Sequence, residues 1–212
     1  MTKQHAELTW TQTGVPISTQ FDDPYFSLGN GQKETKHVFL AGNDLPARFV
    51  DSFHVAELGF GTGLNFLTTV QAFRAANVSG KLHFTSFEAF PMSPSDRLRA
   101  LSHYPDLPLD ALEGADDVLL NIVQGDARVT LPTWHQRADA WFLDGFSPAK
   151  NPELWQPELM AAVAQHTVPG GTAATYTAAG FVRRGLEAAG FDVTRAPGYG
   201  TKRHMTRALL PR

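Results

Sequence analysis

The sequence contains no cysteine, which excludes disulfide bonds, iron–sulfur clusters and thiolate zinc sites. Its eight histidines show neither a His-x-His nor a His-Glu-x-x-His spacing, so the sequence predicts no metal site. The 212 residues also lack an apolar run long enough to span a membrane, and the start, Met1 to His5, lacks the hydrophobic segment of a signal peptide. We therefore expect a soluble cytoplasmic protein that does not contact a membrane.

Positive charge is scarce overall, since 18 Lys and Arg stand against 21 Asp and Glu for a net charge of −3. This balance argues against a nonspecific nucleic-acid binder. The charge is uneven, however, because residues 181–212 carry seven basic residues against only Glu187 and Asp192. An acidic body with a basic end can present a local phosphate-binding face, although ordinary surface scatter would give the same composition.

Apolar strand-like runs alternate with helical stretches over most of the chain. The predicted strands are 53–58, 82–88, 118–123, 138–143, 172–177, 191–195 and 204–210, and the predicted helices are 64–76, 95–102, 157–165 and 181–189. Such alternation predicts βαβ units and a mostly parallel sheet. Only residues 196–203 separate the last two strands, too few for a crossover helix, so we expect these strands to form an antiparallel pair at the sheet edge.

Residues 1–50 do not follow this pattern. The stretch from Leu8 to Ser18, interrupted by Gly14 and Pro16, is typical of a hairpin packed outside the sheet. We therefore expect an N-terminal extension over 1–50, with a hairpin and a substrate-side segment, and one domain over 51–212.

Two residues of the extension are candidates for the mouth of a substrate site. Asp23 and Tyr25 lie in a run of five residues that concentrates acids and aromatics. An aromatic ring there can stack on an unpaired base, which is how single-stranded RNA loops are usually recognised. The alternative is a hydrophobic flap that only closes the core.

A glycine-rich turn follows the first predicted strand, with Glu57 before it and Gly59, Gly61 and Gly63 within it. Glycines at such a turn let the backbone approach a ligand and expose N–H groups at a helix N-terminus. Leu64 stands where a dinucleotide fingerprint has its third glycine, and an acid before the loop would repel a pyrophosphate. The pattern favours a ligand with a cationic end, such as S-adenosylmethionine, over a purely structural turn.

Three further acids follow predicted strands. Glu88 ends the second strand, where a carboxylate can accept hydrogen bonds from both hydroxyls of a ribose. Asp126 follows the third strand and can either accept from an adenine amino group or cap the short helix after it. Asp144 follows the fourth strand and precedes a proline-stiffened loop that carries Phe146 and Trp155. An acid beside aromatic walls suits a flat substrate that carries an amine, and a helix cap or a clamp on a ligand hydroxyl is the alternative.

Several segments together resemble one family, the methyltransferase half of MnmC, the bifunctional enzyme of tRNA wobble-uridine modification. These segments are 21–27, 57–66, 86–88, 141–155, 179–186 and 198–203. The resemblance covers nearly the whole chain from about Phe21 on, and the 141–155 motif is specific. It implies an α/β fold, a Rossmann-like class I S-adenosylmethionine methyltransferase. The implied sheet has seven mostly parallel strands with an antiparallel last strand, plus the N-terminal β extension.

The resemblance also implies an activity and a set of site residues. The family uses S-adenosyl-L-methionine to methylate the aminomethyl group of 5-aminomethyl-2-thiouridine at the wobble position, so the partner is the tRNA anticodon loop. By motif, Gly59, Gly61, Gly63 and Glu88 would hold the cofactor, and Asp144 would be the catalytic residue at the reacting amine. We add Glu57, Asn65 and Asp126 to the predicted cofactor site, and Asp23, Tyr25 and Phe146 to the predicted substrate site.

Four basic residues complete the prediction. Arg183 and Arg184 open the last predicted helix, and Lys202 and Arg203 lie between the last two strands. We expect them to contact the tRNA backbone, because guanidinium groups match the geometry of phosphate. The alternative is that they are solvated charges or form structural ion pairs with Glu187 or Asp192.

Members of this family often continue into an FAD-dependent oxidase domain. The chain stops at Arg212 and residues 59–64 are no flavin fingerprint, so we expect no FAD here and a fused or separate oxidase partner. Two other functions stay open. An aminopropyltransferase of the spermidine-synthase type would have to tolerate the basic C-terminal segment, which repels a polyamine. A noncatalytic nucleotide- or tRNA-binding module would have no need for Asp144 in its loop.

Overall fold

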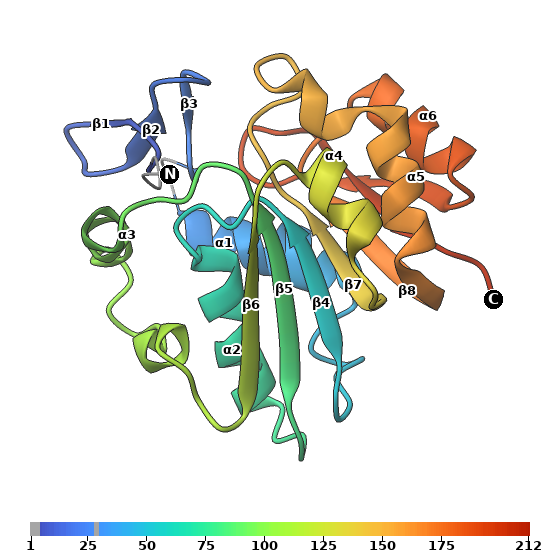
Figure 1. Cartoon of the computed structure of the whole chain (residues 1–212), viewed down its shortest axis with the longest axis horizontal. Helices are drawn as coiled ribbons and strands as arrows, with labels where there is room; N and C mark the ends of the chain where they lie inside the picture. Colours follow the sequence, from blue (N-terminus) through green and yellow to red (C-terminus); the bar gives the residue numbers. More distant parts are fainter. Residues whose placement is uncertain (1–4, 28–29) are drawn as a thin grey trace.

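The computed structural model describes residues 5–27 and 30–212, so what was inferred from Met1 to Gln4 lies outside the described residues. Its centre is a seven-stranded sheet in the order β6-β5-β4-β7-β8-β10-β9 (Figure 1). The strands are β4 (His54–Leu58), β5 (Leu82–Glu88), β6 (Val118–Gln124), β7 (Ala138–Leu143), β8 (Thr167–Thr175), β9 (Asp192–Pro197) and β10 (His204–Leu209). Pairing is parallel from β6 through β8, whereas β10 runs antiparallel to β8 and β9. The predicted mostly parallel sheet is confirmed.

The last two strands form the expected antiparallel pair at the sheet edge, with β10 between β8 and β9. One detail of the sheet differs from the prediction. Strand β8 begins at Thr167, ahead of the predicted start at Thr172. Its pairing with β7 shifts in register between Ala138 and Ala140, because the chain bulges at Gly170, where φ is 80°.

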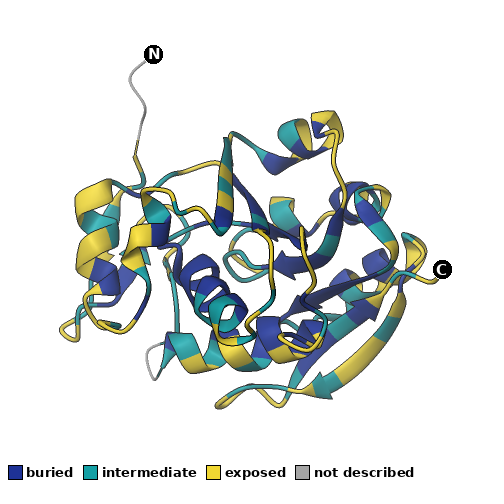
Figure 2. Cartoon of the chain, turned by 90° about the horizontal axis from the view of Figure 1, so that it is seen from below, coloured by how far each residue is buried: buried dark blue, intermediate teal, exposed yellow. Residues whose placement is uncertain are grey.

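Helices cover both faces of the sheet (Figure 1). One face carries α1 (Gly31–Thr35), the π-helix η1 (Lys36–Leu40), the 3₁₀ turn η2 (Ala41–Asn43) and α2 (Leu64–Ala75). The other face carries α4 (Ala127–Thr130), α5 (Pro157–Gln165) and α6 (Gly180–Ala188). The remaining elements are α3 (Pro94–Leu101) and the 3₁₀ turns η3 (Leu109–Leu112), η4 (Leu131–Thr133) and η5 (Pro152–Trp155). A separate apolar core fills each side, and Figure 2 shows the central strands buried between them.

The N-terminal segment contributes more than the predicted hairpin. β1 (Leu8–Trp10), β2 (Pro16–Ser18) and β3 (Asp23–Pro24) form a separate antiparallel three-stranded sheet, whose third strand was not predicted. The helices that follow pack on the main sheet: Val38 and Phe39 are buried in the core, and a Cβ added at Gly42 would lie 2.7 Å from the Cβ of Ala174. The domain boundary at residue 50 stays a prediction, since this segment supplies part of the core.

The register of the central strands places three acids at one edge. Leu58 of β4 is paired with Phe87 of β5 on one side and with Leu143 of β7 on the other. Glu88 and Asp144 are the next residues of β5 and of the β7 segment, so they lie on either side of the glycine turn that follows β4. Glu88 is in turn paired with Gln124, two residues before Asp126. This is the carboxyl edge of the parallel strands, where open α/β folds bind their ligands.

Within residues 5–27 and 30–212, no helix has both the length and the hydrophobicity needed to cross a membrane. In the same ranges no three His, Asp or Glu side chains gather closely enough to hold a metal ion.

Candidate active site

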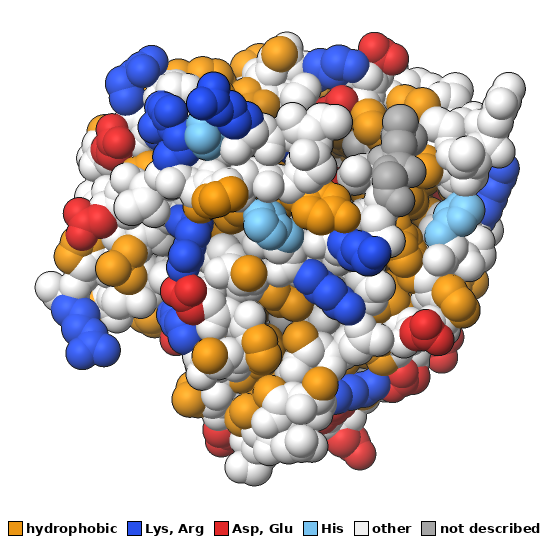
Figure 3. Space-filling view, turned by 180° about the vertical axis from the view of Figure 1, so that it is seen from behind, with side chains coloured by type: hydrophobic (Ala, Val, Ile, Leu, Met, Phe, Trp, Pro, Cys, Tyr) orange, Lys and Arg blue, Asp and Glu red, His pale blue; other side chains and the backbone are white. Residues whose placement is uncertain are grey.

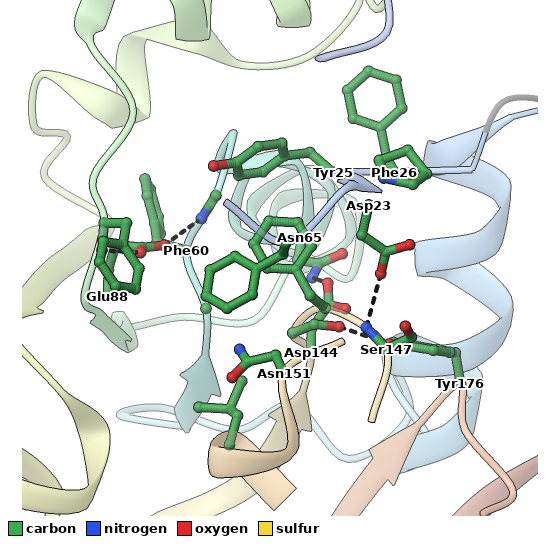
Figure 4. Close-up of a pocket in the computed structure, with 18 of the residues that line it drawn as sticks. Asp23, Tyr25, Phe26, Phe60, Asn65, Glu88, Asp144, Ser147, Asn151 and Tyr176 are labelled. Atoms are coloured by element: carbon green, nitrogen blue, oxygen red, sulfur yellow. Dashed lines mark hydrogen bonds between the residues drawn. The ribbon is translucent and has the colours of Figure 1, made fainter. Parts of the chain in front are cut away.

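A cavity of about 770 Å³ opens at the carboxyl edge of the sheet. It is lined by the segments that follow β4, β5 and β7, and by residues 20, 21 and 23–27 of the N-terminal segment. In Figure 4, Glu88 and Tyr176 lie on opposite sides of the view, with Asn65 and Asp144 between them. We call the part with Gly61, Glu88, Phe90 and Asp126 the Glu88 end. The part with Glu34, Asn65, Asp144, Tyr176 and Lys202 is the Asp144 end.

The glycine turn separates these two ends. Gly59, Gly61 and Gly63 have φ values of 90°, 51° and 78°, a region of backbone conformation that favours glycine. A Cβ at Gly59 would lie 2.5 Å from the carbonyl oxygen of Asp144, and one at Gly61 would lie 3.0 Å from the Tyr25 ring. Gly59 and Gly61 line the cavity, whereas Gly63 acts behind it as the N-cap of α2.

Glu88 is held by backbone donors. It is 8% exposed and lines the cavity. Its Oε2 accepts a hydrogen bond from the Gly61 N–H at 2.9 Å, and its Oε1 accepts from the Phe90 N–H at 2.7 Å (Figure 4). Each carboxylate oxygen keeps a second lone pair, so Glu88 can still accept from a ligand hydroxyl.

Asp126 has one of the two roles that its sequence context left open, the helix cap. It is the N-cap of α4, since its Oδ1 accepts from the Arg128 N–H at 2.9 Å. It also forms an ion pair with the Arg128 guanidinium at 2.6 Å, and these hydrogen bonds lower its pKa. Because Asp126 and Arg128 both line the cavity, the predicted cofactor contact stays a prediction beside the confirmed cap.

Asn65 holds the carboxylate of Asp144. Its Nδ2 donates to Asp144 Oδ2 at 2.6 Å and to Glu57 Oε1 at 2.9 Å (Figure 4), while its Oδ1 accepts from the Thr35 hydroxyl at 2.6 Å. Glu57 also accepts from the Ser86 hydroxyl at 2.7 Å. The first turn of α2 thus links the acid before the glycine turn to the acid after β7.

Glu57 lies behind the lining of the cavity. It is fully buried and is not among the residues that line the cavity, so it lies behind Asn65 instead of facing a ligand. All five residues of β4 are buried, because helices cover both faces of the sheet, and the sequence of such a strand does not show which way a side chain points. Glu57 contacts Asn65 here, and its predicted contact with the cofactor stays a prediction.

Burial raises the pKa of both Asp144 and Glu57. It raises the pKa of Asp144 to about 7, against the opposing hydrogen bond from Asn65. Burial, together with the nearby charge of Asp144, raises the pKa of Glu57 to about 8. A cation bound in the cavity would favour the ionised form of both groups. The Asp144 end is therefore suited to a positively charged ligand.

The N-terminal segment closes over the loop that follows β7. Asp23 Oδ2 accepts from the Ser147 N–H at 2.8 Å (Figure 4), and Lys150 donates to Asp22. The ring of Phe146 stacks on Phe21 with centroids 4.7 Å apart and meets Tyr25 edge-on at 5.0 Å. Asp23, Tyr25 and Phe146 all line the cavity, as the substrate-site prediction requires.

The predicted basic residues divide into two groups. Arg203 and Arg184 are exposed and Arg183 is half-buried. Burial lowers the pKa of His204, and so do the charges of Arg195, Arg203 and Arg183, which surround it. Figure 3 shows basic side chains gathered around a histidine on the face seen from behind. Lys202 instead faces inward, since its Nζ lies 2.7 Å from Glu34 Oε1 and the residue lines the cavity. In this structure Lys202 pairs with Glu34, and its predicted contact with the tRNA backbone stays a prediction.

Sequence reasoning did not single out several polar residues that line the cavity, among them Tyr176, Glu34, Thr35 and Lys150. Tyr176 follows the end of β8, and its position one strand beyond Asp144 at the carboxyl edge could have drawn attention to it. Glu34 and Thr35 lie on a five-residue helix that has no apolar period, and Lys150 is an isolated charge in a loop. No local signal marks these three.

The sequence matches a family described as S-adenosyl-L-methionine-dependent methyltransferase over residues 99–211. It is 46% identical to the tRNA 5-methylaminomethyl-2-thiouridine biosynthesis bifunctional protein MnmC of Stutzerimonas stutzeri, across 98% of this chain and 35% of that protein. It is also 46% identical to the protein of the same name from Pseudomonas aeruginosa, across 95% of this chain and 34% of that protein. The chain thus spans about a third of the length of these curated relatives.

A solved structure gives a similar result. The crystal structure of MNMC2 from Aquifex Aeolicus superposes with a TM-score of 0.76 at 25% sequence identity, covering 100% of this chain and 73% of that one. The Glycopeptide N-methyltransferase MtfA, at 19% identity and a TM-score of 0.53, has a similar fold. Both comparisons support the fold described above.

Proposed function

Because this chain belongs to a family of S-adenosyl-L-methionine-dependent methyltransferases, we propose that it methylates a primary amine, the aminomethyl group of 5-aminomethyl-2-thiouridine at the tRNA wobble position. The observation that carries this proposal is the carboxylate of Asp144, which Asn65 holds in the same cavity as the glycine turn. The names of the relatives at 46% identity supply the substrate class.

The cavity fits the cofactor. Gly61 leaves its backbone open beneath Tyr25, and Glu88 and Asp126 present carboxylates at the same end. Gly59, Gly61, Glu88 and Asp126 would hold the cofactor, with Glu88 accepting from ribose hydroxyls. When bound, S-adenosyl-L-methionine supplies a methyl group on a cationic sulfur, and the carboxylates that line the cavity favour such a cation.

Asp144 would act on the amine of the substrate. An alkylamine has a pKa of about 10, so it arrives as an ammonium ion and must lose a proton before it can act as a nucleophile. Asp144 can accept an N–H hydrogen bond, which orients the nitrogen, and can take up the proton. With a pKa near 7 it is a better proton acceptor than an ordinary aspartate. Orientation can contribute on the order of 7–11 kcal/mol to such a reaction.

Asn65 and Glu57 would position Asp144 without touching the substrate. Asn65 uses both of its N–H groups, one on each acid, so its amide cannot rotate without losing a hydrogen bond. Glu57 fixes that amide from behind, and the Ser86 hydroxyl fixes Glu57. A carboxylate held in this way keeps one orientation while substrates enter and leave.

The RNA would be recognised at two places. Tyr25 and Phe146 provide aromatic surface beside the cavity, on which an unpaired wobble base can stack. Arg183, Arg184 and Arg203 would contact the phosphates that flank this base in the anticodon loop. Such binding weakens with salt, with a slope of about 0.7 for each phosphate neutralised in a single-stranded loop.

The relatives are named as bifunctional, and this chain matches only about a third of their length. We propose that their second function, the FAD-dependent oxidase implied by the family resemblance, acts as a fused or separate partner. No residue of the glycine turn is assigned to FAD. The cytoplasmic location stays a prediction.

The test compares methyl acceptors side by side. Radiolabelled S-adenosyl-L-methionine and the chain are incubated with tRNA that bears 5-aminomethyl-2-thiouridine, and with the same tRNA lacking the aminomethyl group. Label should enter only the first RNA. Transfer to neither RNA, despite calorimetric binding of the cofactor, would support the noncatalytic alternative. Aminopropyl transfer from the decarboxylated cofactor to putrescine would support the aminopropyltransferase.

A further inference from the structure

An ammonium group of the protein itself occupies the Asp144 end of the cavity. Lys202 lies in the loop between β9 and β10, and its Nζ is 2.7 Å from Glu34 Oε1 and 4.1 Å from the centre of the Tyr176 ring. Glu34 comes from α1 and Tyr176 follows β8, so three separate elements meet here. A carboxylate beside an aromatic face is a typical binding site for an alkylammonium ion.

Glu34 differs from the other acids that line the cavity in the group that its carboxylate binds, which is the ammonium group of Lys202. Glu88 accepts from backbone N–H groups, Asp126 pairs with Arg128, and Asp144 accepts from Asn65. Asp23 lies 3.9 Å from Lys150 Nζ but also accepts from the Ser147 N–H. Glu153 is exposed at the rim. Among the described residues, the carboxylate of Glu34 has Lys202 as its side-chain partner, and the Glu34 side chain is only 13% exposed. If Lys202 left, Glu34 would be a nearly buried carboxylate in need of a cation.

Tyr176 is fixed in place by a hydrogen bond, whereas Lys202 is free to move. The Tyr176 hydroxyl donates to the carbonyl of Gly145 at 2.7 Å, which fixes the ring next to Asp144. Burial and the charges of Asp144, Asp23 and Glu34 raise the pKa of Tyr176, so the phenol stays a donor. Lys202 is a long side chain on a surface loop and is 44% exposed. It can turn out to solvent while Glu34 and Tyr176 stay in place.

We propose that Glu34 and Tyr176 form the subsite that binds the alkylammonium group of the acceptor, and that Lys202 fills this subsite until the acceptor displaces it. The proposal rests on the proposed function, because it requires an acceptor with an amine. It assigns the two acids of the Asp144 end different tasks. Glu34 binds the incoming cation, and Asp144 orients the nitrogen and accepts its proton.

This proposal and the earlier prediction for Lys202 lead to opposite results for one substitution. If Lys202 competes with the acceptor, Lys202→Met should empty the subsite and lower the KM for RNA. If Lys202 contacts phosphate, the same change should raise the KM. Glu34→Gln keeps the shape of the side chain but removes its charge, so it should weaken acceptor binding without affecting the Glu88 end.

The first experiment measures kcat and KM for tRNA bearing 5-aminomethyl-2-thiouridine, together with the cofactor Kd. Glu34→Gln should raise the KM by about tenfold, as expected for the loss of a charge-assisted contact, and leave the cofactor Kd within about twofold. Lys202→Met should lower the KM by about threefold or more, on the same scale. Lys33→Met, an exposed charge on the same helix, and Glu187→Gln, an exposed acid on α6, control for the change of net charge. An unchanged KM in Glu34→Gln, or a raised KM in Lys202→Met, would overturn the proposal.

A second experiment does not depend on methyl transfer, so it distinguishes failure of the subsite from failure of the proposed function. n-Butylammonium chloride is titrated into protein with ¹³C-labelled tyrosine, and the Tyr176 ring is followed by NMR. The ring signal of Lys202→Met should shift with saturation, and that of the double variant Lys202→Met/Glu34→Gln should shift about tenfold more weakly or not at all. Identical titrations of the two variants, or no shift in either, would contradict the subsite even if the chain methylates tRNA.

Discussion

The two ends of the cavity hold their carboxylates by different means. At the Glu88 end, Glu88 accepts from two backbone N–H groups, and Asp126 pairs with Arg128, two positions away in the sequence. At the Asp144 end, Asp144 depends on the side chain of Asn65, and Glu34 depends on Lys202, which is 168 positions away in sequence. Backbone donors are fixed by the fold and do not titrate, whereas side chains can turn and change charge. The Glu88 end is thus suited to hold an invariant cofactor, and the Asp144 end to handle a substrate that must change protonation.

The largest effect is expected at the residue that separates the two ends. Gly59 has φ of 90°, and an added Cβ would lie 2.5 Å from the backbone oxygen of Asp144. Gly59→Ala should destabilise the fold by about 2–5 kcal/mol through strain and overpacking, and should abolish both cofactor binding and methyl transfer. Chemical denaturation and calorimetry measure these losses.

Gly114→Ala is the matched control for Gly59→Ala. Gly114 has φ of 111°, and nothing lies within 4 Å of an added Cβ, so this change introduces backbone strain without a steric clash. It should lower stability by about 1–3 kcal/mol and keep cofactor binding. If both substitutions had equal effects, backbone strain alone would explain the loss of stability and of cofactor binding. The clash of an added Cβ at Gly59 with the Asp144 carbonyl oxygen would then play no part.

Removal of the Asn65 side chain should impair methyl transfer at the Asp144 end far more than cofactor binding at the Glu88 end. Asn65→Ala leaves Asp144 and Glu57 without their shared donor, so Asp144 loses its orientation. We expect kcat to fall about 10²-fold, the size of effect that a misplaced catalytic group produces, while the cofactor Kd changes by less than about fivefold. Gln71→Ala, on the same helix but away from the cavity lining, should change neither. A cofactor Kd that rises as much as kcat falls would place Asn65 at the Glu88 end instead.

The pKa of Glu57 gives the Asp144 end a pH dependence. The folded protein binds this proton up to a pH of about 8, whereas an unfolded glutamate releases it near 4.5. Between these values the folded state holds the extra proton, so stability falls as pH rises, by at most about 1.4 kcal/mol per pH unit. Glu57→Gln should therefore gain stability over the parent chain at pH 8 and lose that gain near pH 5. Denaturation midpoints at both pH values test this, and a gain that is independent of pH would contradict it.

The smallest effect is expected at the surface contact of the N-terminal segment. Lys150 pairs with Asp22, whose side chain is 92% exposed, so Lys150→Met should change the free energy of unfolding by less than about 1 kcal/mol. Asp23→Ala should cost more, because it removes the acceptor of the Ser147 N–H. If urea denaturation shows Lys150→Met to be the more costly change, the solvent-exposed pair holds the segment and the backbone contact does not.

The sequence predicts the Glu88 end better than the Asp144 end for a physical reason. Glu88 ends one strand of the sheet, and Asp126 and Asp144 come shortly after two others. Parallel strands bring their carboxyl ends to one edge, so local pattern is enough to place these acids. The inward turn of Lys202 depends on Glu34 and Tyr176, and the segments that supply them have no periodicity that links them. The orientation of Glu57 is likewise invisible, since every residue of its strand is buried. Contacts between distant side chains are set by packing, which a single sequence does not display.

The most direct test of this account is a crossed measurement on two variants that keep side-chain shape. Cofactor affinity by calorimetry and the single-turnover rate of methyl transfer at saturating cofactor are measured for Glu88→Gln and Asp144→Asn. We predict that Glu88→Gln weakens cofactor binding about tenfold and keeps the rate within about threefold, whereas Asp144→Asn slows transfer by about 10² or more and keeps the affinity within about threefold. Asp144→Asn turnover near the parent rate, or the same pattern of losses in both variants, would contradict the division of the cavity into a cofactor end and an acceptor end.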